Sequence, residues 1–174
     1  MKDNRSKYFV FVPFCLLAQA FQAEGLVKYE WKSTIKPFVE LLLKYDINII
    51  QMPCPETNNN VNIKRNPLGL SKYDNLEFNN HTEELTNEVS KQVENILKNG
   101  YEVLAILGIE QSPSCCVNYI YTNKGMVNRK GLYMEKLYKK IENKKIPFIG
   151  INRKYIKKSL NSLEKIIIEA KKKE

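Results

Sequence analysis

Histidine is almost missing from this chain of 174 residues, which has only His81, and its four cysteines include no C-x-x-C pair. Structural zinc sites usually combine closely spaced cysteine pairs, or cysteine with histidine, so these absences argue against a zinc site. His81 stands at the start of a segment with helical periodicity. We expect it to be exposed or to cap that helix rather than to bind a metal.

Repeats and biased tracts are also absent. The sequence has no solenoid period and no collagen-like, prion-like or acidic tract, and it contains only seven glycines and seven prolines. These absences exclude fibrous and low-complexity proteins. With 43% hydrophobic and 27% charged residues, the composition is that of an ordinary globular protein. The length predicts one domain over residues 1–174, large enough to fold without disulfides.

Positive charge is in excess, with a formal net charge of +9. Clustered lysine and arginine would suit a nucleic acid, but here they alternate with glutamate and gather only in the terminal run Lys171–Lys173. No nucleic-acid recognition motif accompanies the charge. We therefore expect neither a nucleic acid nor a membrane as partner, and the oligomeric state stays open.

The N-terminal segment allows two interpretations. Basic residues precede an apolar run from Tyr8 to Leu17, which Ala18-Gln19-Ala20 follows, and this imitates a signal peptide. The aromatic and β-branched residues of the run, together with Pro13, favour a buried strand instead. We expect a cytoplasmic protein. Export is the alternative, and cleavage after Ala20 would then remove Cys15.

Strand and helix patterns alternate along the chain. Four short apolar runs predict buried strands: Tyr8–Phe14, Ile47–Met52, Val103–Ile109 and Pro147–Ile151. Segments with helical periodicity follow them, at 33–45, 82–98, 132–143 and 158–171. This order predicts an α/β fold with a doubly wound, Rossmann-like and mostly parallel sheet, covered by helices on both faces. Such sheets bind ligands outside the carboxyl ends of their strands.

Two long loops flank the expected site. The first, at about 53–80, is either a cover with Lys64 and Arg65 as anion contacts or a solvated loop. The second, 115–131, holds Tyr119, Tyr121 and Asn123, and these residues could form an opposite wall.

Three cysteines follow three of the predicted strands. Cys15 and Cys54 come directly after the first two strands, and Cys115 lies just beyond the third. Because the carboxyl ends of parallel strands meet at one edge, the three thiols should converge there, where thiolates could hold a soft metal or a cluster. The alternative is chance packing, since cysteine is often simply buried.

The neighbouring residues favour a site. Pro53-Cys54-Pro55-Glu56 and Ser112-Pro113-Ser114-Cys115 are rigid turns that present a thiol. A disulfide is not expected in a reducing compartment. Three thiolates without a fourth suit a [4Fe-4S] cluster with one open iron.

These motifs resemble a known family. Cys15-Leu16-Leu17, Pro53-Cys54-Pro55-Glu56 and Ser112-Pro113-Ser114-Cys115 are similar to the three signatures of the thiouracil desulfurase family and related desulfidases, and the resemblance covers nearly the whole chain. It implies that Cys15, Cys54 and Cys115 each ligate one iron of a [4Fe-4S] cluster. It also implies an enzyme that removes sulfur from a small thiocarbonyl compound by non-redox hydrolysis, with the open iron taking the sulfur.

The resemblance also gives roles to neighbouring side chains. Glu56 would shuttle the proton of the attacking water, and Ser112 and Ser114 would orient the substrate or the water; the alternative for all three is to stabilise turns. The sequence departs from the family pattern at Cys116, where glycine is usual, and around Cys15. Cys116 would narrow the pocket, act as another ligand or accept sulfur.

Two other functions remain open at this point. A non-catalytic iron-sulfur or sulfide carrier would keep the cysteines and use Glu56 only as a structural residue. A plain α/β binding domain would bind no metal at all.

Overall fold

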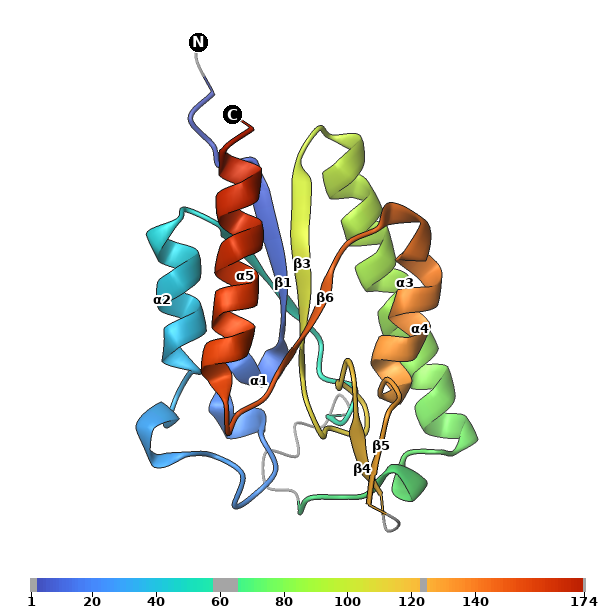
Figure 1. Ribbon diagram of the computed structural model, residues 1–174. Helices are drawn as coiled ribbons and strands as arrows, with labels where there is room; N and C mark the ends of the chain where they lie inside the picture. The colour runs from blue at the N-terminus through green and yellow to red at the C-terminus, as the bar shows by residue number, and fades with distance from the viewer. Residues whose placement is uncertain (1–2, 58–65, 123–124, 174) are drawn as a thin grey trace.

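Four parallel strands form the main sheet of the computed structural model, which describes residues 3–57, 66–122 and 125–173 (Figure 1). The strands lie in the order β2-β1-β3-β6. Each begins and ends within one residue of the bounds predicted from its apolar run. Their bounds are β1 (Tyr8–Pro13), β2 (Asn48–Met52), β3 (Glu102–Ile109) and β6 (Phe148–Ile151).

Helices cover both faces of the sheet (Figure 1). On one face, Val10 and Val12 of β1 belong to a core that contains side chains of α2 and α5. On the other face, Phe11 packs into a second core with side chains of α3 and α4. Because successive strand residues point to opposite faces, both faces of β1 must be apolar. The predicted doubly wound architecture is confirmed. The helices are α2 (Lys36–Lys44), α3 (Leu76–Lys98), α4 (Leu132–Ile141) and α5 (Ile156–Lys171).

Helix α3 begins six residues before the predicted start at residue 82. The Asn75 side chain accepts a hydrogen bond from the backbone N–H of Phe78 at 2.9 Å and so caps the helix earlier. The predicted loop at 53–80 therefore ends at Asn75. His81 consequently lies inside the helix and is partly buried, which corrects the expectation of a capping or exposed residue.

Several short elements escaped prediction. One helical turn, α1 (Phe14–Leu17), follows β1 directly, and an antiparallel hairpin of β4 (Ile120–Thr122) and β5 (Gly125–Val127) interrupts the predicted loop at 115–131. All are too short to produce a periodic apolar pattern. The single turns of 3-10 helix are η1 (Gln19–Phe21), η2 (Tyr29–Trp31), η3 (Leu70–Lys72) and η4 (Glu142–Lys144).

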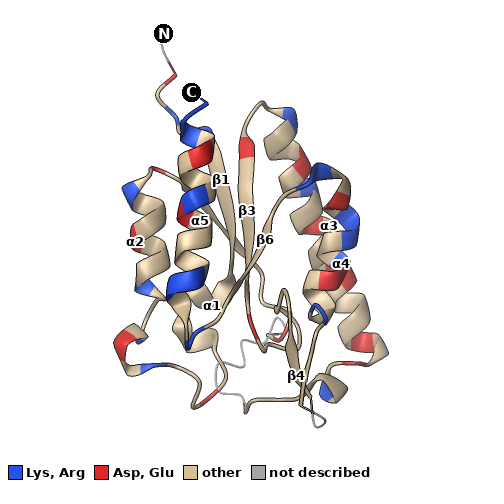
Figure 2. Ribbon diagram, viewed as in Figure 1, with Lys and Arg blue, Asp and Glu red and all other residues tan. Residues whose placement is uncertain are grey.

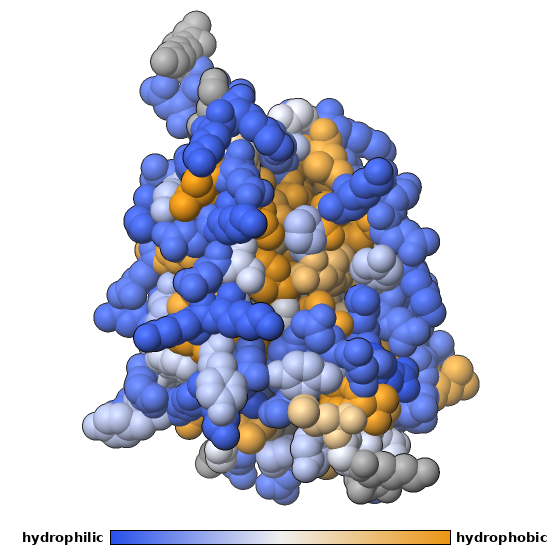
Figure 3. Space-filling model, viewed as in Figure 1, coloured by the Kyte–Doolittle hydropathy of each residue, from blue (hydrophilic) through white to orange (hydrophobic). Residues whose placement is uncertain are grey.

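The surface carries its charges in mixed fashion. Lysine and arginine are spread over the outer helices with acidic residues between them (Figure 2), and Lys136 and Lys140 of α4 both pair with Glu83 of α3. An apolar strip lies between α5 and α4, over the edge strand β6 (Figure 3). Within the described parts of the chain, no helix is both long and apolar enough to span a membrane.

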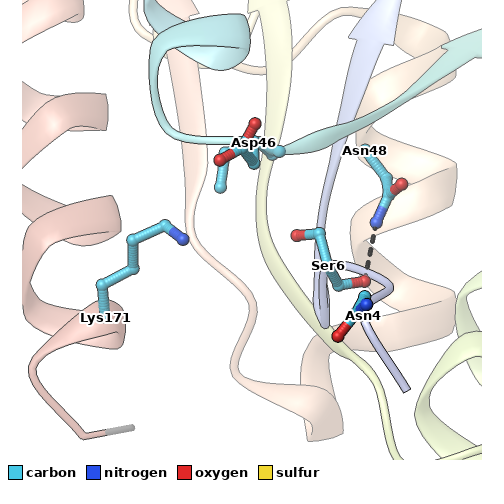
Figure 4. Close-up of a pocket in the computed structure, with 6 residues that line it drawn as sticks. Asn4, Ser6, Asp46, Asn48 and Lys171 are labelled. Atoms are coloured by element: carbon cyan, nitrogen blue, oxygen red, sulfur yellow. Dashed lines mark hydrogen bonds between the residues drawn. The ribbon is translucent and has the colours of Figure 1, made fainter. Parts of the chain in front are cut away.

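A polar hollow marks the amino-terminal edge of the sheet. It is lined by Asn4, Ser6, Asp46, Asn48 and Lys171, and the Asn48 amide donates to the Ser6 carbonyl at 3.0 Å (Figure 4). No cysteine lines this hollow. The thiols follow the opposite, carboxyl ends of the strands.

A buried carboxylate ties β6 to the loop after β3. Glu110 is 4% exposed and accepts hydrogen bonds from Asn118 Nδ2 at 2.6 Å and from the Tyr119 backbone N–H at 3.2 Å. Gly150 makes room for it, since a Cβ at that position would overlap the carboxylate. This packing fixes the chain that continues from β3 toward β4.

We expect Gly150→Ala to lower the free energy of unfolding by about 2–3 kcal/mol, because the added methyl must displace a buried, hydrogen-bonded carboxylate. Urea denaturation measures the loss. Gly69→Ala is the matched control: a Cβ there would meet nothing within 4 Å, so we expect a change of less than about 0.5 kcal/mol. Equal stabilities of the two variants would contradict the prediction.

Candidate metal and active site

The direction of winding reverses between β1 and β3. The chain passes from β1 outward to β2 and then crosses back to β3 and β6 on the other side. At such a reversal the connections leave in opposite directions and open a crevice beyond the carboxyl ends of the strands. Cys15 follows β1 and Cys115 follows β3, so the two strands beside the crevice each lead to a thiol.

Register places Cys15 and Cys54 at the same level. Pro13 of β1 pairs with Met52 of β2, and each cysteine lies two residues beyond its member of that pair. The sequence places Cys15 directly after a strand, whereas the structure places it in the short helix α1. A helical turn there brings the chain over the edge of the sheet rather than away from it.

Two glutamines hold the Cys15 segment. The buried Gln19 side chain donates to the Cys15 carbonyl oxygen, and Gln22 Nε2 lies 3.8 Å from the Cys15 sulfur as a donor. Helix α1 is also tied to the following chain, since the backbone N–H of Ile35 donates to Leu16 at 2.8 Å. The departure from the family pattern at Gln19 therefore has a local structural role.

Cys54 lies in a tight turn between two prolines. Its carbonyl accepts hydrogen bonds from the backbone N–H of Thr57 at 3.3 Å and from the Thr57 hydroxyl at 3.1 Å. Proline fixes φ at Pro53 and Pro55, so the direction of the thiol is set by the backbone. This turn also carries Glu56 toward the loop after β3.

The backbone around Cys115 is pressed between β3 and the start of α4. The loop doubles back, so that Ile109 N–H donates to the Cys115 carbonyl at 3.1 Å. A Cβ at Gly108 would overlap that carbonyl oxygen, and a Cβ at Gly131 would overlap the backbone of Ser114. Two glycines therefore permit the close approach on which the position of Cys115 depends.

The pKa of Cys115 responds to the charges of the other two cysteines. Burial raises the pKa of the Cys115 thiol well above its ordinary value, and negative charge on Cys54, Glu56 and Cys15 raises it further, while the Ser114 hydroxyl opposes the shift. Charges act on one another in this way only over short distances. Cys54 and Cys15 therefore lie near enough to Cys115 for their charges to act on it. In the part of the chain that the structure describes, Cys15, Cys54, Cys115 and Cys116 form no disulfide bond.

Glu56, Ser112 and Ser114 form one hydrogen-bonded network. Glu56 Oε1 accepts from Ser114 Oγ at 2.5 Å and from Ser112 Oγ at 3.3 Å, and its Oε2 accepts from the Tyr73 hydroxyl at 3.1 Å. Ser114 Oγ also lies 3.5 Å from the Cys115 sulfur as a donor. The carboxylate is thus connected to a thiol through a single serine hydroxyl.

Ser112 also supports the turn. Its hydroxyl oxygen accepts the backbone N–H of Cys115 at 3.0 Å and that of Ser114 at 3.3 Å. The start of α4 supports the same turn from the other side, because Leu132 N–H donates to Pro113 and Tyr133 N–H donates to Ser114, each at 3.1 Å. The N–H groups at the start of the helix, which have no partner within the helix, thus donate to the loop that contains Cys115.

Cys116 faces a different direction from Cys115. It is 0% exposed, and its thiol donates to the Arg129 carbonyl at 3.4 Å. Burial raises the pKa of Cys116 to about 12, with the Glu110 carboxylate adding to the rise. The Cys116 thiol is therefore neutral and points toward the protein backbone, as expected for a residue that packs the interior.

Three residues beside the thiols were not predicted. The Tyr73 hydroxyl donates a hydrogen bond to Glu56. Negative charge on Cys15 acts on the pKa of Arg153, and negative charge on Cys115 and Cys54 acts on the pKa of Tyr133. Arg153 comes two residues after Ile151 at the end of β6, so the rule that located the cysteines would have found it. Tyr133 is spaced by four from the core residue Leu137, a visible helical signal.

The residues predicted to line the site from the two long loops differ in where the structure places them. Lys64, Arg65 and Asn123 lie outside the described residues. Tyr119 accepts a hydrogen bond from Asn152 Nδ2 at 2.6 Å and lines a hollow beside β6, while Tyr121 is 62% exposed.

The sequence of residues 10–146 matches the 2-thiouracil desulfurase family. The chain belongs to this family. The matched region contains all three converging cysteines, together with Glu56 and both serines of the network. It ends before β6 and Arg153.

Two similar proteins extend the comparison of this family member. An uncharacterized protein of Methanocaldococcus jannaschii is 29% identical over 167 residues, which cover 94% of this chain and 99% of that protein. A solved structure of a [4Fe-4S]-dependent thiouracil desulfidase is 18% identical, with a TM-score of 0.47, and the likeness covers 83% of this chain and 91% of that one.

We expect Ser112→Ala to destabilise the protein by about 1–2 kcal/mol, because two backbone N–H groups of the Cys115 turn lose their acceptor. Amide hydrogen exchange should accelerate at Ser114 and Cys115. Ser162→Ala is the control, since the Ser162 hydroxyl bonds only within exposed helix α5, and there we expect less than about 0.5 kcal/mol. Unchanged exchange at the two turn amides would show that Ser112 does not support the turn.

Proposed function

We propose that this protein is a [4Fe-4S]-dependent desulfidase that removes sulfur from a small, thiouracil-like thiocarbonyl compound by hydrolysis. One observation carries the proposal: the Cys115 thiol lies near Cys54, Cys15 and Glu56, and the Glu56 carboxylate is hydrogen bonded to two serines. Membership of the 2-thiouracil desulfurase family supports it. Since the thiols must remain reduced, we further propose that the protein works in the cytoplasm.

The donor set fits a cluster with one open iron. Cys15, Cys54 and Cys115 would each bind one iron, and thiolate sulfur is the ligand that iron-sulfur clusters use. Within residues 3–57, 66–122 and 125–173, the structure contains no group of three or more histidine, cysteine, aspartate or glutamate residues that could hold a single metal ion. A cluster makes a different demand, because its three thiolates bind three separate iron atoms.

Buried polar groups beside the thiols also fit an additional partner. The Tyr133 hydroxyl is buried and has no hydrogen-bond partner in the described structure. It lies close enough to Cys115 and Cys54 for their charges to raise its pKa. Buried hydroxyls are nearly always paired. A sulfur-rich group bound by these two cysteines would supply the acceptor.

When bound, the cluster would supply a soft, Lewis-acidic iron for the thiocarbonyl sulfur of the substrate. The protein's own groups would handle the protons. Glu56 Oε1 would take a proton as a water oxygen attacks the thiocarbonyl carbon, and Glu56 would return that proton as the C–S bond breaks. Thiocarbonyl and water become carbonyl and hydrogen sulfide, so no electron is gained or lost overall.

The two serines would aim the carboxylate. Both hydroxyls donate to the same oxygen, Glu56 Oε1, while Tyr73 holds the other oxygen. Three donors from two segments, the turn after β3 and the residue Tyr73, fix the plane of the carboxylate, so little orientation remains to be gained in the transition state. Ser114, which also donates toward the Cys115 sulfur, would connect the proton-carrying group to the metal site.

Metal analysis tests the ligand set. After anaerobic reconstitution, we expect about four irons and four acid-labile sulfides per chain, and a large loss of both in Cys15→Ala, Cys54→Ala or Cys115→Ala. Cys116→Ala is the matched control, because its thiol bonds the Arg129 carbonyl and should leave iron content unchanged. Iron retained in any of the three single variants would remove that cysteine from the ligand set.

Turnover tests the role of Glu56. In reconstituted protein given 2-thiouracil, we expect Glu56→Gln to lower kcat by about 10²–10³-fold with iron content unchanged, because glutamine cannot accept the proton. Glu164→Gln is the control, since Glu164 pairs with Lys44 on the outer helices. Wild-type turnover with an unaffected Glu56→Gln variant would contradict the proton role. A loaded wild type that turns over no thiocarbonyl would instead favour a non-catalytic cluster or sulfide carrier.

A further inference from the structure

Tyr133 is placed at an unusual position for a tyrosine. It is the second residue of α4, its side chain is 0% exposed, and its ring packs in the core formed by α3, α4 and one face of the sheet. Its hydroxyl and His81 Nε2 are the buried side-chain polar atoms without a hydrogen-bond partner in the described structure. An unpaired buried hydroxyl destabilises the folded state, whereas phenylalanine would fill the same space without that loss.

The backbone holds Tyr133 against the Cys115 turn. Its N–H donates to the Ser114 carbonyl at 3.1 Å, and the missing side chain of Gly131 lets the helix start approach that carbonyl. The residue is therefore fixed relative to Cys115 by main-chain contacts and not by a flexible side chain. Its position depends on the same packing that positions the thiol.

Cys115 packs against the core that contains the Tyr133 ring. Burial raises the pKa of Tyr133 well above its ordinary value, and negative charge on Cys115, then on Cys54 and then on Glu88 raises it further. The hydroxyl therefore keeps its proton and is available as a hydrogen-bond donor. Two cysteines thus lie near a donor that has no acceptor.

We infer that Tyr133 is a positioning residue for the sulfur-rich group held by Cys54 and Cys115, to which its hydroxyl donates a hydrogen bond. The acceptor is a cysteine thiolate or a bridging sulfide of the cluster, and the inference rests on the function proposed above. Hydrogen bonds to cluster sulfurs stabilise the more negative, reduced state and so raise the reduction potential. The donor also adds an interaction that is lost when the cluster leaves.

The Tyr133 hydroxyl should affect the metal-free protein and the reconstituted protein differently. In the metal-free form the hydroxyl has no partner, so Tyr133→Phe should leave the free energy of unfolding unchanged or increased. In the reconstituted form the same change removes a hydrogen bond. A residue that serves only to pack the core would behave alike in both forms.

The experiment compares wild type, Tyr133→Phe and Tyr138→Phe, each metal-free and reconstituted. Tyr138 lies on the same helix with its side chain 39% exposed, and it controls for the loss of one hydroxyl. In Tyr133→Phe alone we expect a more negative midpoint potential and several-fold faster loss of the cluster to a chelator, with iron content at loading unchanged. Denaturation of the metal-free proteins should show no destabilisation by either change.

Each other result is decisive. A reconstituted Tyr133→Phe protein with the wild-type potential and the wild-type rate of cluster loss would overturn the inference and leave the proposed function standing. Destabilisation of the metal-free Tyr133→Phe protein would overturn it as well, since the hydroxyl would then have a partner without the cluster. A wild type that takes up no iron would overturn both the inference and the proposed function.

Discussion

The close backbone contact between residues 112–116, β3 and the start of α4 is the constraint on which the site depends. The loop after β3 could leave the sheet in any direction, but it folds back so that the Cys115 carbonyl bonds the N–H of Ile109. Only the absence of a Cβ at Gly108 and Gly131 permits this approach. Once the loop is held there, Cys115 lies near Cys54 and Cys15, and the hydroxyls of Ser112 and Ser114 bond Glu56.

The start of α4 gives this contact its strength. A helix leaves its first N–H groups without partners inside the helix, and here they bond the carbonyls of Pro113 and Ser114. The loop receives donors for its carbonyls, and the helix receives acceptors for its N–H groups. The same arrangement places Tyr133 beside the thiols. Packing, helix capping and the proposed metal site are therefore parts of one local structure, and a change to one of them should affect the others.

Much of the architecture could be predicted from the sequence, because buried parallel strands leave strong apolar runs and helices leave a period of 3.6 residues. The same pattern places Cys15, Cys54 and Cys115 after the carboxyl ends of three strands, and the structure keeps them there. The start of α3 was predicted too late because the polar residues Asn79, Asn80 and His81 separate Leu76 and Phe78 from the apolar period that begins at Leu85. Helix α1 and the β4–β5 hairpin are shorter than any period that could reveal them.

The contacts within the site were the least predictable part. Nothing in the sequence near Tyr73 shows that its hydroxyl reaches Glu56, because the two residues are 17 positions apart and neither lies in an element with a regular period. The direction of Cys116 is equally a product of tertiary structure, since adjacent residues in an irregular turn can face opposite ways. Sequence pattern locates residues along elements with regular geometry, whereas the loops between those elements must be placed by their packing.

The charges around Cys115 support the proposed metal group over an organic ligand. Burial makes ionisation of Cys115 less favourable, and negative charge on Cys54, Glu56 and Cys15 adds to this effect, so bound positive charge would favour the thiolate. Arg153 supplies some near Cys15, but burial disfavours its charged form as well. Iron would compensate the thiolates directly at the sulfur atoms and leave the Glu56 carboxylate, held by three hydroxyls, free to exchange a proton with substrate.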